Sequence, residues 1–436
     1  MTSAASRVLV LGAYGLIGLE IVRRLRTSGH DVVGLGRSIA TGQRLIPEIA
    51  WIGADLATLT TPDAWRPYLH GIGAVVNASG ALQDGARDNL AVSQSLAIRT
   101  LIAACEEAGV TRFIQISAPG ADPAARTAFL RTKGEADAAL RASPVDWLIL
   151  KPGLVIGANA YGGTALLRML AAFPFVQPLV LGDSLVQTVA AEEVAAAVAM
   201  ALAGTVPMRA DYDLMEDTPQ TVRNIVGQFR RWLGFATAWA TLDLPVWIGQ
   251  AVAKFADTAG WLGWRSPLRS TALRVLSDGV TGDPGPWKRA TGRTCRSLRD
   301  TLAALPNTAQ ERVFARARLV FPVLLVVLSI FWLASGVIGI IQREAAARLL
   351  DGVLPAPSVN ALVLAGGAID IAIGMSLIVR SWARRAAIAA IVVSFGYLLA
   401  GTVLTPWLWA DPIGPFVKVL PGIALALAVA ALMEER

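Results

Sequence analysis

The chain opens with an apolar run that ends in three glycines and continues as a helix-periodic stretch. Val8 to Leu11 are consecutive apolar residues, which is typical of a parallel strand buried on both faces. Glycines follow at positions 12, 15 and 18, and apolar residues then recur at helical spacing up to Leu25. This order predicts a turn at which a pyrophosphate approaches the backbone and meets the free N–H groups of a helix N-terminus.

Further short apolar runs alternate with helical patterns along the next hundred residues. The expected strands are Val32–Leu35, Ile49–Ile52, Ala74–Val76 and Arg112–Ser117, and a long helix is expected from Asn89 to Ala108. Such a rhythm predicts an α/β fold, a Rossmann-type doubly wound parallel sheet with its ligand crevice at the carboxyl ends of the strands.

The residues at those strand ends are the candidate cofactor site. An NAD site usually places an acidic residue about 20 residues after the glycines, on the ribose hydroxyl. Here Gly36 and Arg37 stand at that point, and Arg37 is suited to a 2′-phosphate, so NADP(H) is favoured over NAD(H). The alternative is a solvated surface arginine. The expected cofactor-binding residues are Gly12, Tyr14, Gly15, Leu16, Ile17, Gly18, Arg37, Asp55, Leu56, Asn77, Ala78, Gly80, Lys133 and Pro152.

This segment resembles the atypical, extended branch of the short-chain dehydrogenase/reductase superfamily. It is most similar to the group that contains the nucleotide-binding accessory subunit of respiratory complex I and the NmrA-like proteins. The resemblance rests on the glycines, Arg37, Asp55, Asn77–Gly80, Ser117, Arg131–Lys133 and Leu150–Gly157. It implies a nucleotide-binding core at residues 1–157 and a substrate lobe at residues 158–300.

In that family a tyrosine four residues before a lysine acts as acid in hydride transfer, and a serine assists it. Ser117 and Lys133 match their positions, but Phe129 occupies the tyrosine position and carries no exchangeable proton. Three interpretations stay open. The protein binds NADP(H) without hydride chemistry; Tyr161 or Tyr14 replaces the missing tyrosine; or Lys133 is a helix-surface lysine. The candidate catalytic residues are therefore Ser117, Lys133 and Tyr161.

Residues 232–264 contain five of the chain's 13 tryptophans. One interpretation is the hydrophobic core of the substrate lobe. The other is a membrane-facing surface, because tryptophan favours the headgroup zone and Arg265, Arg269 and Arg274 would meet anionic lipid. A lipophilic substrate would enter at such a surface.

The C-terminal part, residues 316–436 after a connector at 301–315, is dominated by apolar segments. Four reach the roughly 20 residues that a span requires: 319–341, 360–379, 386–404 and 413–433. Arg316 and Arg318 precede the first, whereas Arg380, Arg384 and Arg385 separate the second from the third. The positive-inside rule then places both termini in the cytoplasm.

Two charged residues stand within these spans. A carboxylate at the middle of a span, such as Asp370, costs about 2.5–3.5 kcal/mol on insertion scales, so it is expected to face a partner. We expect it to approach Lys418, which alternatively snorkels to the interface. Together with Gly374, Tyr397 and the Pro406–Pro412 loop, these residues resemble the DoxX-like family, which implies a four-helix membrane bundle.

Composition agrees with a membrane protein and narrows the function. The chain is 54% hydrophobic, has a mean hydropathy of +0.54 and carries a net charge of +7. The two cysteines and two histidines lie far apart, so no metal site is predicted. The sequence shows no basic patch with interleaved aromatic residues, so nucleic-acid binding is not indicated. The first apolar run is a strand, so no signal peptide is expected.

We therefore expect a multi-pass protein of the bacterial inner membrane whose partner is the lipid bilayer. The first hypothesis is an NADP-dependent oxidoreductase acting on a quinone- or polyprenoid-like substrate. The alternative is a non-catalytic NADPH-binding assembly or regulatory factor of a respiratory or other membrane complex.

Overall fold

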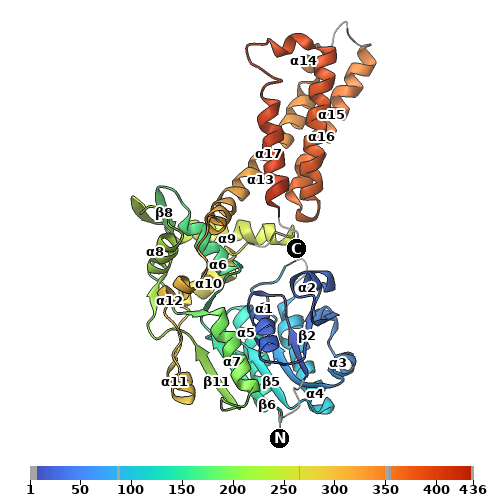
Figure 1. Ribbon diagram of the computed structural model, residues 1–436. Helices are drawn as coiled ribbons and strands as arrows, with labels where there is room; N and C mark the ends of the chain where they lie inside the picture. Colours follow the sequence, from blue (N-terminus) through green and yellow to red (C-terminus); the bar gives the residue numbers. More distant parts are fainter. Residues whose placement is uncertain (1–6, 86–88, 265, 349–352, 354, 434–436) are drawn as a thin grey trace. The chain divides into compact units, whose positions relative to one another are not determined.

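The computed structural model describes residues 7–85, 89–264, 266–348, 353 and 355–433. The chain divides into two compact units: Met1–Thr258 with Ser266–Arg312, and Ala259–Arg265 with Val313–Arg436. Figure 1 labels most of their helices and several of their strands.

The first unit is built on one parallel sheet of seven strands, in the order β11-β6-β5-β4-β1-β2-β3. Its strands are β1 (Arg7–Leu11), β2 (Val32–Gly36), β3 (Ala50–Gly53), β4 (Ile72–Asn77), β5 (Arg112–Ile116), β6 (Asp146–Pro152) and β11 (Ala210–Leu214). The winding direction reverses between β1 and β4, which is the switch point at which ligands bind in open α/β sheets. The predicted Rossmann-type fold is confirmed.

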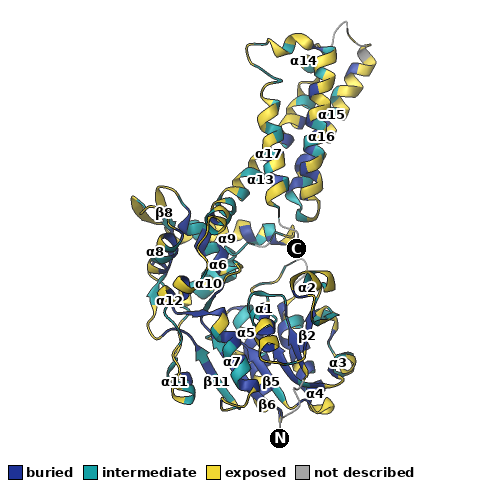
Figure 2. Ribbon diagram, viewed as in Figure 1, coloured by how far each residue is buried: buried dark blue, intermediate teal, exposed yellow. Residues whose placement is uncertain are grey.

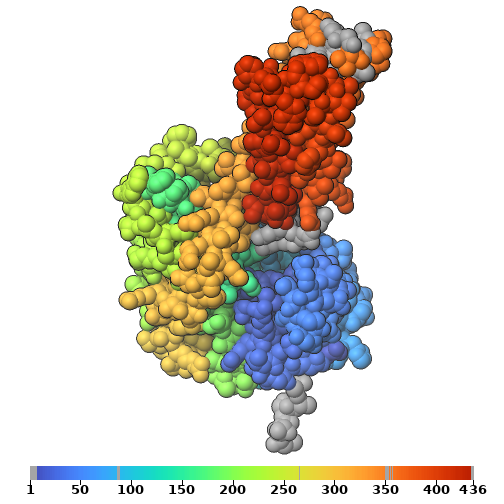
Figure 3. Space-filling model, turned by 45° about the horizontal axis from the view of Figure 1, so that its top comes forward, coloured from blue at the N-terminus to red at the C-terminus, as the bar shows by residue number. Residues whose placement is uncertain are grey.

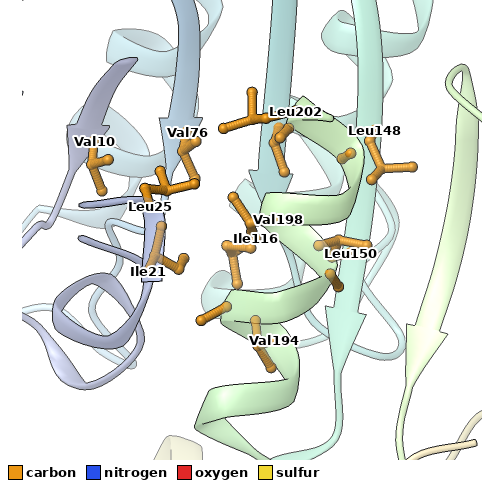
Figure 4. Packing of buried hydrophobic residues seen from close by; sticks show 14 of the residues in the cluster. Val10, Ile21, Leu25, Val76, Ile116, Leu148, Leu150, Val194, Val198 and Leu202 are labelled. Atoms are coloured by element: carbon orange, nitrogen blue, oxygen red, sulfur yellow. The ribbon is translucent and has the colours of Figure 1, made fainter. Parts of the chain in front are cut away.

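The alternation of side chains along β1 explains why helices cover both faces of the sheet. Val8 and Val10 pack into one apolar cluster, and Leu9 and Leu11 pack into another. Helices α1 (Leu16–Thr27) and α7 (Ala191–Leu202) close the first cluster, as Figure 4 shows for Ile21, Leu25, Val194 and Val198. Helices α3 (Pro62–Leu69) and α4 (Ala97–Ala108) close the second.

The expected helix from Asn89 to Ala108 is found in two pieces. A π-helical segment, η2 (Ala91–Leu96), runs directly into α4, and Gly109 ends α4 in the left-handed conformation at φ 69°. The remaining helices of the nucleotide half are α2 (Ile39–Leu45) and α5 (Ala128–Ala142), and a short 3₁₀ turn, η1 (Leu56–Thr58), follows β3.

The region after β6 is a set of short elements held together by one buried carboxylate. Glu216 accepts hydrogen bonds from the backbone N–H and hydroxyl of Thr188, from the Gln220 amide and from the N–H of Leu298. The elements of this region are β7 (Leu154–Ile156), α6 (Gly163–Ala171), β8 (Val176–Leu179), β9 (Leu185–Val186), β10 (Thr188–Ala190), β12 (Gln220–Thr221), α8 (Val222–Trp232), β13 (Ala240–Asp243), α9 (Val246–Trp261), α10 (Ser270–Asp278), α11 (Gly285–Thr291) and α12 (Leu298–Ala304).

A second buried charge, Arg168 on α6, fixes the start of the long helix α13 (Ala309–Ile341). The Arg168 side chain is fully buried, and its Nε lies 3.0 Å from Glu311 Oε2. Its Nη2 donates to the carbonyl oxygens of Gly157 and Ala158, and the guanidinium stacks on Trp232 at 5.2 Å. The loop after β7 and the first turn of α13 are therefore joined through one side chain.

The second unit is helical, with α14 (Arg343–Arg348), α15 (Ala356–Ile378), α16 (Arg380–Leu404), η3 (Pro406–Trp409) and α17 (Val419–Leu432) beside α13. Helices α13, α15 and α16 are long and apolar enough to cross a membrane. No more than 28% of each apolar window is buried, so most of these side chains face outward, as Figure 2 shows. That exposure fits a lipid environment.

The fourth predicted span differs from the expectation. Helix α17 begins at Val419 rather than at Ile413, because Gly414 adopts a left-handed turn at φ 62° and Pro415 follows it. Its 14 residues extend about 21 Å, less than the roughly 30 Å of the hydrocarbon core. A full fourth span therefore stays a prediction.

Glycines set the spacing of the helices in this unit. A Cβ on Gly367 of α15 would lie 2.6 Å from Ile340, and one on Gly374 would lie 2.7 Å from Leu333, both on α13. Close helix contact through glycine is the usual way in which membrane helices gain packing energy. Helices α16 and α17 also lie side by side, as the space-filling view shows (Figure 3).

The Arg168–Glu311 pair gives a stability prediction. Glu311→Ala leaves the buried Arg168 charge without its carboxylate, so the free energy of unfolding of the first unit falls by about 3 kcal/mol. Glu107→Ala is the matched control, because Glu107 pairs with exposed Arg66 and its loss leaves stability unchanged. Thermal unfolding of the full chain in detergent measures both variants, and equal midpoints would contradict the assignment.

Candidate functional site

The glycine turn between β1 and α1 is shaped by two close backbone approaches. Gly12 adopts φ 68°, and a Cβ there would lie 2.8 Å from the Ala78 carbonyl oxygen at the end of β4. A Cβ on Gly18 would lie 2.2 Å from the carbonyl oxygen of Gly12, so α1 sits directly on the turn. Only glycine fits at either position, and the turn is consequently narrow enough for a phosphate to reach its backbone.

The N-terminus of α1 is open for an anion. Gly15 is its N-cap and supplies no side-chain hydrogen bond. The amides of Leu16, Ile17 and Gly18 form the first turn, in which backbone N–H groups have no partner within the helix. Free N–H groups and the positive dipole end together favour a phosphate here.

Tyr14 has a structural role at the end of β2. Its hydroxyl accepts a hydrogen bond from the Ser38 N–H at 3.2 Å, and its ring lies across Gly36, where a Cβ would come within 2.3 Å. The side chain of Arg37, between these two residues, is exposed. Asp55 follows β3, where its carboxylate caps η1 by accepting from Ala57 N–H, with Leu56 half-buried beside it.

At the end of β4 the chain passes from the buried side chain of Asn77 to the exposed residue Gly80. The Asn77 side chain donates to Gln115 at 2.9 Å and accepts from the Ser79 N–H, which fixes the turn through Ala78. Gly80, which is exposed, lies beside two polar groups: a Cβ there would be 3.2 Å from Gln94 Oε1 and 3.6 Å from Lys133 Nζ.

Lys133, Ser117 and Phe129 are brought together as the family resemblance implies. Lys133 is 7% exposed, donates to the Ile116 carbonyl at 2.8 Å, and lies 5.9 Å from the centre of the Phe129 ring. Lys133 is thus not a surface lysine, and that interpretation is wrong. The Ser117 hydroxyl donates to a group that the sequence reasoning did not consider, the buried carboxylate of Asp137.

Asp137 stands one helical turn after Lys133 on α5, and both are buried. Burial lowers the pKa of Lys133 to about 8, against the attraction of Asp137. Burial also raises the pKa of Asp137, against the Ser117 hydrogen bond and the Lys133 charge. For both groups, loss of hydration therefore outweighs the mutual attraction.

Asp137 and Gln94 are the two site residues missed from the sequence. Asp137 is four residues after Lys133, a spacing that places both on one helix face, so this signal was available. Gln94 gave no signal, because its position depends on the π-helical segment η2, a feature often found at functional sites. Its Oε1 is buried and accepts no hydrogen bond from the described residues.

Pro152 and Tyr161 lie further from this cluster along the chain. Pro152 is the buried last residue of β6, and the following loop reaches Gly157, where a Cβ would lie 3.4 Å from the Leu16 side chain. Tyr161 precedes α6 and is 42% exposed. Its role as a substitute acid stays a prediction.

The polar residues of the membrane helices are paired differently from the expectation. Asp370 is buried and accepts hydrogen bonds from the hydroxyls of Ser335 and Tyr397, each at 2.8 Å. Lys418 is exposed at the start of α17, and the described residues show no ion pair between it and Asp370. Two neutral donors from α13 and α16 satisfy the carboxylate without a cation.

Comparison with known proteins identifies both parts of the chain. Residues 12–203 match the family model described as NAD(P)H-binding, and residues 329–427 match the DoxX-like family. The chain therefore joins an NAD(P)-binding Rossmann domain to a C-terminal DoxX-like domain. The DoxX-like match and the three apolar helices make it a membrane protein.

Two curated relatives match over part of the chain. Protein FMP52-2, mitochondrial, of Scheffersomyces stipitis is 26% identical over 165 residues, covering 35% of this chain and 68% of that protein. Photosystem II assembly factor Ycf39 of Synechocystis is 32% identical over 149 residues, covering 33% of this chain and 44% of that protein.

Solved structures share the fold at low identity. The Bordetella bronchiseptica enzyme WbmH, in complex with NAD+, has a TM-score of 0.52 at 15% identity, covering 69% of this chain and 96% of its own. The NADPH-dependent quinone oxidoreductase QOR2 from Escherichia coli, complexed with NADPH, has a TM-score of 0.52 at 18% identity, covering 68% and 98%. Both show the Rossmann-type fold alone.

The turn geometry gives a binding prediction. Gly18→Ala pushes α1 away from the Gly12 carbonyl, so NADPH affinity falls at least about tenfold. Gly29→Ala, just after the opposite end of α1, is the control: a Cβ there meets no atom within 4 Å, and its positive φ strains the chain away from the turn. Fluorescence titration of the full chain with NADPH measures both, and equal affinities would contradict the proposed phosphate position.

Proposed function

We propose that the protein is a membrane-anchored, NADP(H)-dependent reductase whose hydride acceptor is a lipophilic, quinone-like molecule. The observation that carries this proposal is the arrangement around Lys133. The residues that hold a nicotinamide nucleotide are kept, whereas the group that protonates an ordinary carbonyl substrate is replaced by Phe129.

The residues present fit a dinucleotide. The turn at Gly12 and Gly18 is a cradle that any Cβ would fill, and Gly80 is a second such position. Beside Gly80, Gln94 Oε1, which has no partner among the described residues, would accept a hydrogen bond from a hydroxyl of the nucleotide. Lys133 would supply the positive charge that the family uses at the nicotinamide ribose. When bound, NADPH supplies a hydride to an acceptor.

Preference for NADP(H) is supported by Tyr14. Its ring occupies the space next to Gly36, so an aspartate at this strand end, the usual partner of the NAD ribose, does not fit without displacing the ring. The exposed guanidinium of Arg37 is the nearest forked donor in the sequence for a 2′-phosphate.

The acceptor class follows from the missing acid. The Ser117 hydroxyl already donates to Asp137, and Lys133 is assigned to the nicotinamide ribose, so neither replaces the tyrosine beside a substrate. A ketone that takes a hydride becomes a strongly basic alkoxide, but a quinone becomes a phenolate whose conjugate acid has a pKa of about 10. Such an anion takes its proton later from water, and hydride transfer then proceeds without a positioned acid.

We place the protein in a bacterial inner membrane with both termini in the cytoplasm. Arg380, Arg384 and Arg385, at the start of α16, support this orientation by the positive-inside rule. The acceptor would bind in the substrate lobe, residues 158–300, next to the nucleotide-binding core at 1–157.

A second candidate is a non-catalytic, NADPH-binding assembly or regulatory factor of a membrane complex. It is favoured by the 32% identity to a protein named as a photosystem II assembly factor and by the same loss of the tyrosine. In this case the nucleotide site would control binding to a partner complex.

Purified full chain in lipid nanodiscs, supplied with NADPH and a short-chain benzoquinone, separates the two candidates. The reductase proposal expects NADPH oxidation matched by quinone reduction, and Lys133→Met lowers kcat/KM by about 10²-fold. Phe129→Tyr adds an acid and extends the activity to simple ketones. Tight NADPH binding without any quinone reduction, together with co-purification of a membrane complex, would instead establish the assembly factor.

The cofactor preference is tested separately. Arg37→Ala removes the donor for the 2′-phosphate, so NADPH affinity falls about tenfold while NADH affinity stays unchanged. Arg44→Ala, an exposed arginine on α2, is the matched control. Competitive titration of the full chain with both nucleotides gives the ratio, and an equal loss for NADH would overturn the preference.

A further inference from the structure

Helix α9 presents an aromatic face that is largely exposed. Trp247, Phe255 and Trp261 are 67%, 70% and 66% exposed, whereas Ala253 and Ala256 on the opposite side are buried. These tryptophans are therefore not the core of the substrate lobe. Large aromatic side chains gathered on one exposed helix face indicate a binding surface rather than chance exposure.

The polar groups of α9 are arranged for an anionic surface. Lys254 lies on the exposed side, between the positions of the aromatic residues. Asp257, the one acidic residue of the helix, is turned inward, where it accepts from the Gln83 amide at 2.8 Å and from Arg269 at 3.3 Å. The exposed face thus combines aromatic rings with a cation and holds no carboxylate, the composition of helices that lie in a membrane interface.

The ribbon of β8 and β13 carries a second exposed aromatic pair next to α9. The rings of Phe175 and Trp239 pack at 4.8 Å, and Trp239 is 80% exposed. Strand β13 leads into α9, and Gly249 of that helix packs on Val180, just after β8. The ribbon is therefore held beside the N-terminal half of α9.

The segment that follows α9, residues 262–264, lies at the ends of two membrane helices. Within the second unit, the indole N–H of Trp264 donates to the Ile378 carbonyl at 2.7 Å, and the Arg380 N–H donates to the Leu262 carbonyl. Ile378 and Arg380 are where two candidate spans, α15 and α16, end and begin. Arg380 also stacks on Trp264 at 5.4 Å, and both residue types are typical of the membrane–water boundary.

We propose that α9 and the β8–β13 ribbon form an interfacial membrane-binding surface, with the aromatic face inserted among the headgroups of an anionic lipid leaflet. The occupant is the bilayer itself, because the segment directly after α9 lies at the ends of two candidate spans and because the exposed face of α9 carries Lys254 and no carboxylate. This inference does not depend on the proposed reaction. It gives the substrate lobe direct contact with the phase in which a lipophilic molecule dissolves.

Spin labels on the full chain in nanodiscs of phosphatidylglycerol and phosphatidylcholine test the surface. In a Cys105→Ala, Cys295→Ala background, single cysteines replace Trp247, Phe255 or Trp239, all of them exposed. Ile330→Cys, exposed on α13, is the lipid reference, and Glu107→Cys on α4 is the water reference. Retained NADPH binding shows that each variant is folded.

Labels on the face are expected to resemble Ile330→Cys, with greater access to oxygen than to a water-soluble nickel complex. Adding Lys254→Glu lowers that ratio in anionic nanodiscs and leaves it nearly unchanged in purely phosphatidylcholine ones. Labels that behave like Glu107→Cys would overturn the proposal. Labels shielded from both reagents would overturn it as well, since a second copy or a protein partner would then cover the face.

Discussion

The structure of the nucleotide half depends on one contact, the approach of the α1 backbone to the carbonyl of Gly12. Because Gly18 has no side chain, the helix starts almost on top of the end of β1, and its open amides point to the switch point between β1 and β4. Gly12 is in turn pressed against Ala78, so the ends of β1 and β4 cannot shift independently. A substitution at either glycine would be transmitted to every residue that borders the crevice.

The cluster around Lys133 shows how a site can keep its binding function while its acid–base chemistry changes. Phe129 preserves the ring that packs beside the lysine and removes only the hydroxyl. The serine that would have assisted the tyrosine instead donates to one oxygen of the buried Asp137, whose other oxygen has no hydrogen-bond partner among the described residues. An unpaired buried carboxylate costs several kcal/mol, so this hydrogen bond stabilises the fold whether or not the protein is an enzyme.

Sequence reasoning was most successful where the pattern is local. The strand runs, the glycine spacing and the apolar helices predicted the Rossmann-type sheet and the spans of α13, α15 and α16, because each signal lies within one element. It was less successful where a side chain meets a distant one. Asp370 is bonded by Ser335 and Tyr397, which come from two other helices. The sequence does not show whether a carboxylate in a span is satisfied by a cation or by two hydroxyl groups. Gln94 reaches the site only through the extra residue that a π-helical turn inserts.

The Arg168–Glu311 pair has a consequence for how the chain can be divided. Glu311 lies in the first turn of α13, and the first unit ends at Arg312. A soluble fragment that stops before Glu311 would keep the buried guanidinium and lose its counter-ion. In such a fragment, weak nucleotide binding would reflect a loosened loop at Gly157 and Ala158 as much as the glycine turn itself. The first turn of α13 therefore has to be kept in any fragment used to study the first unit.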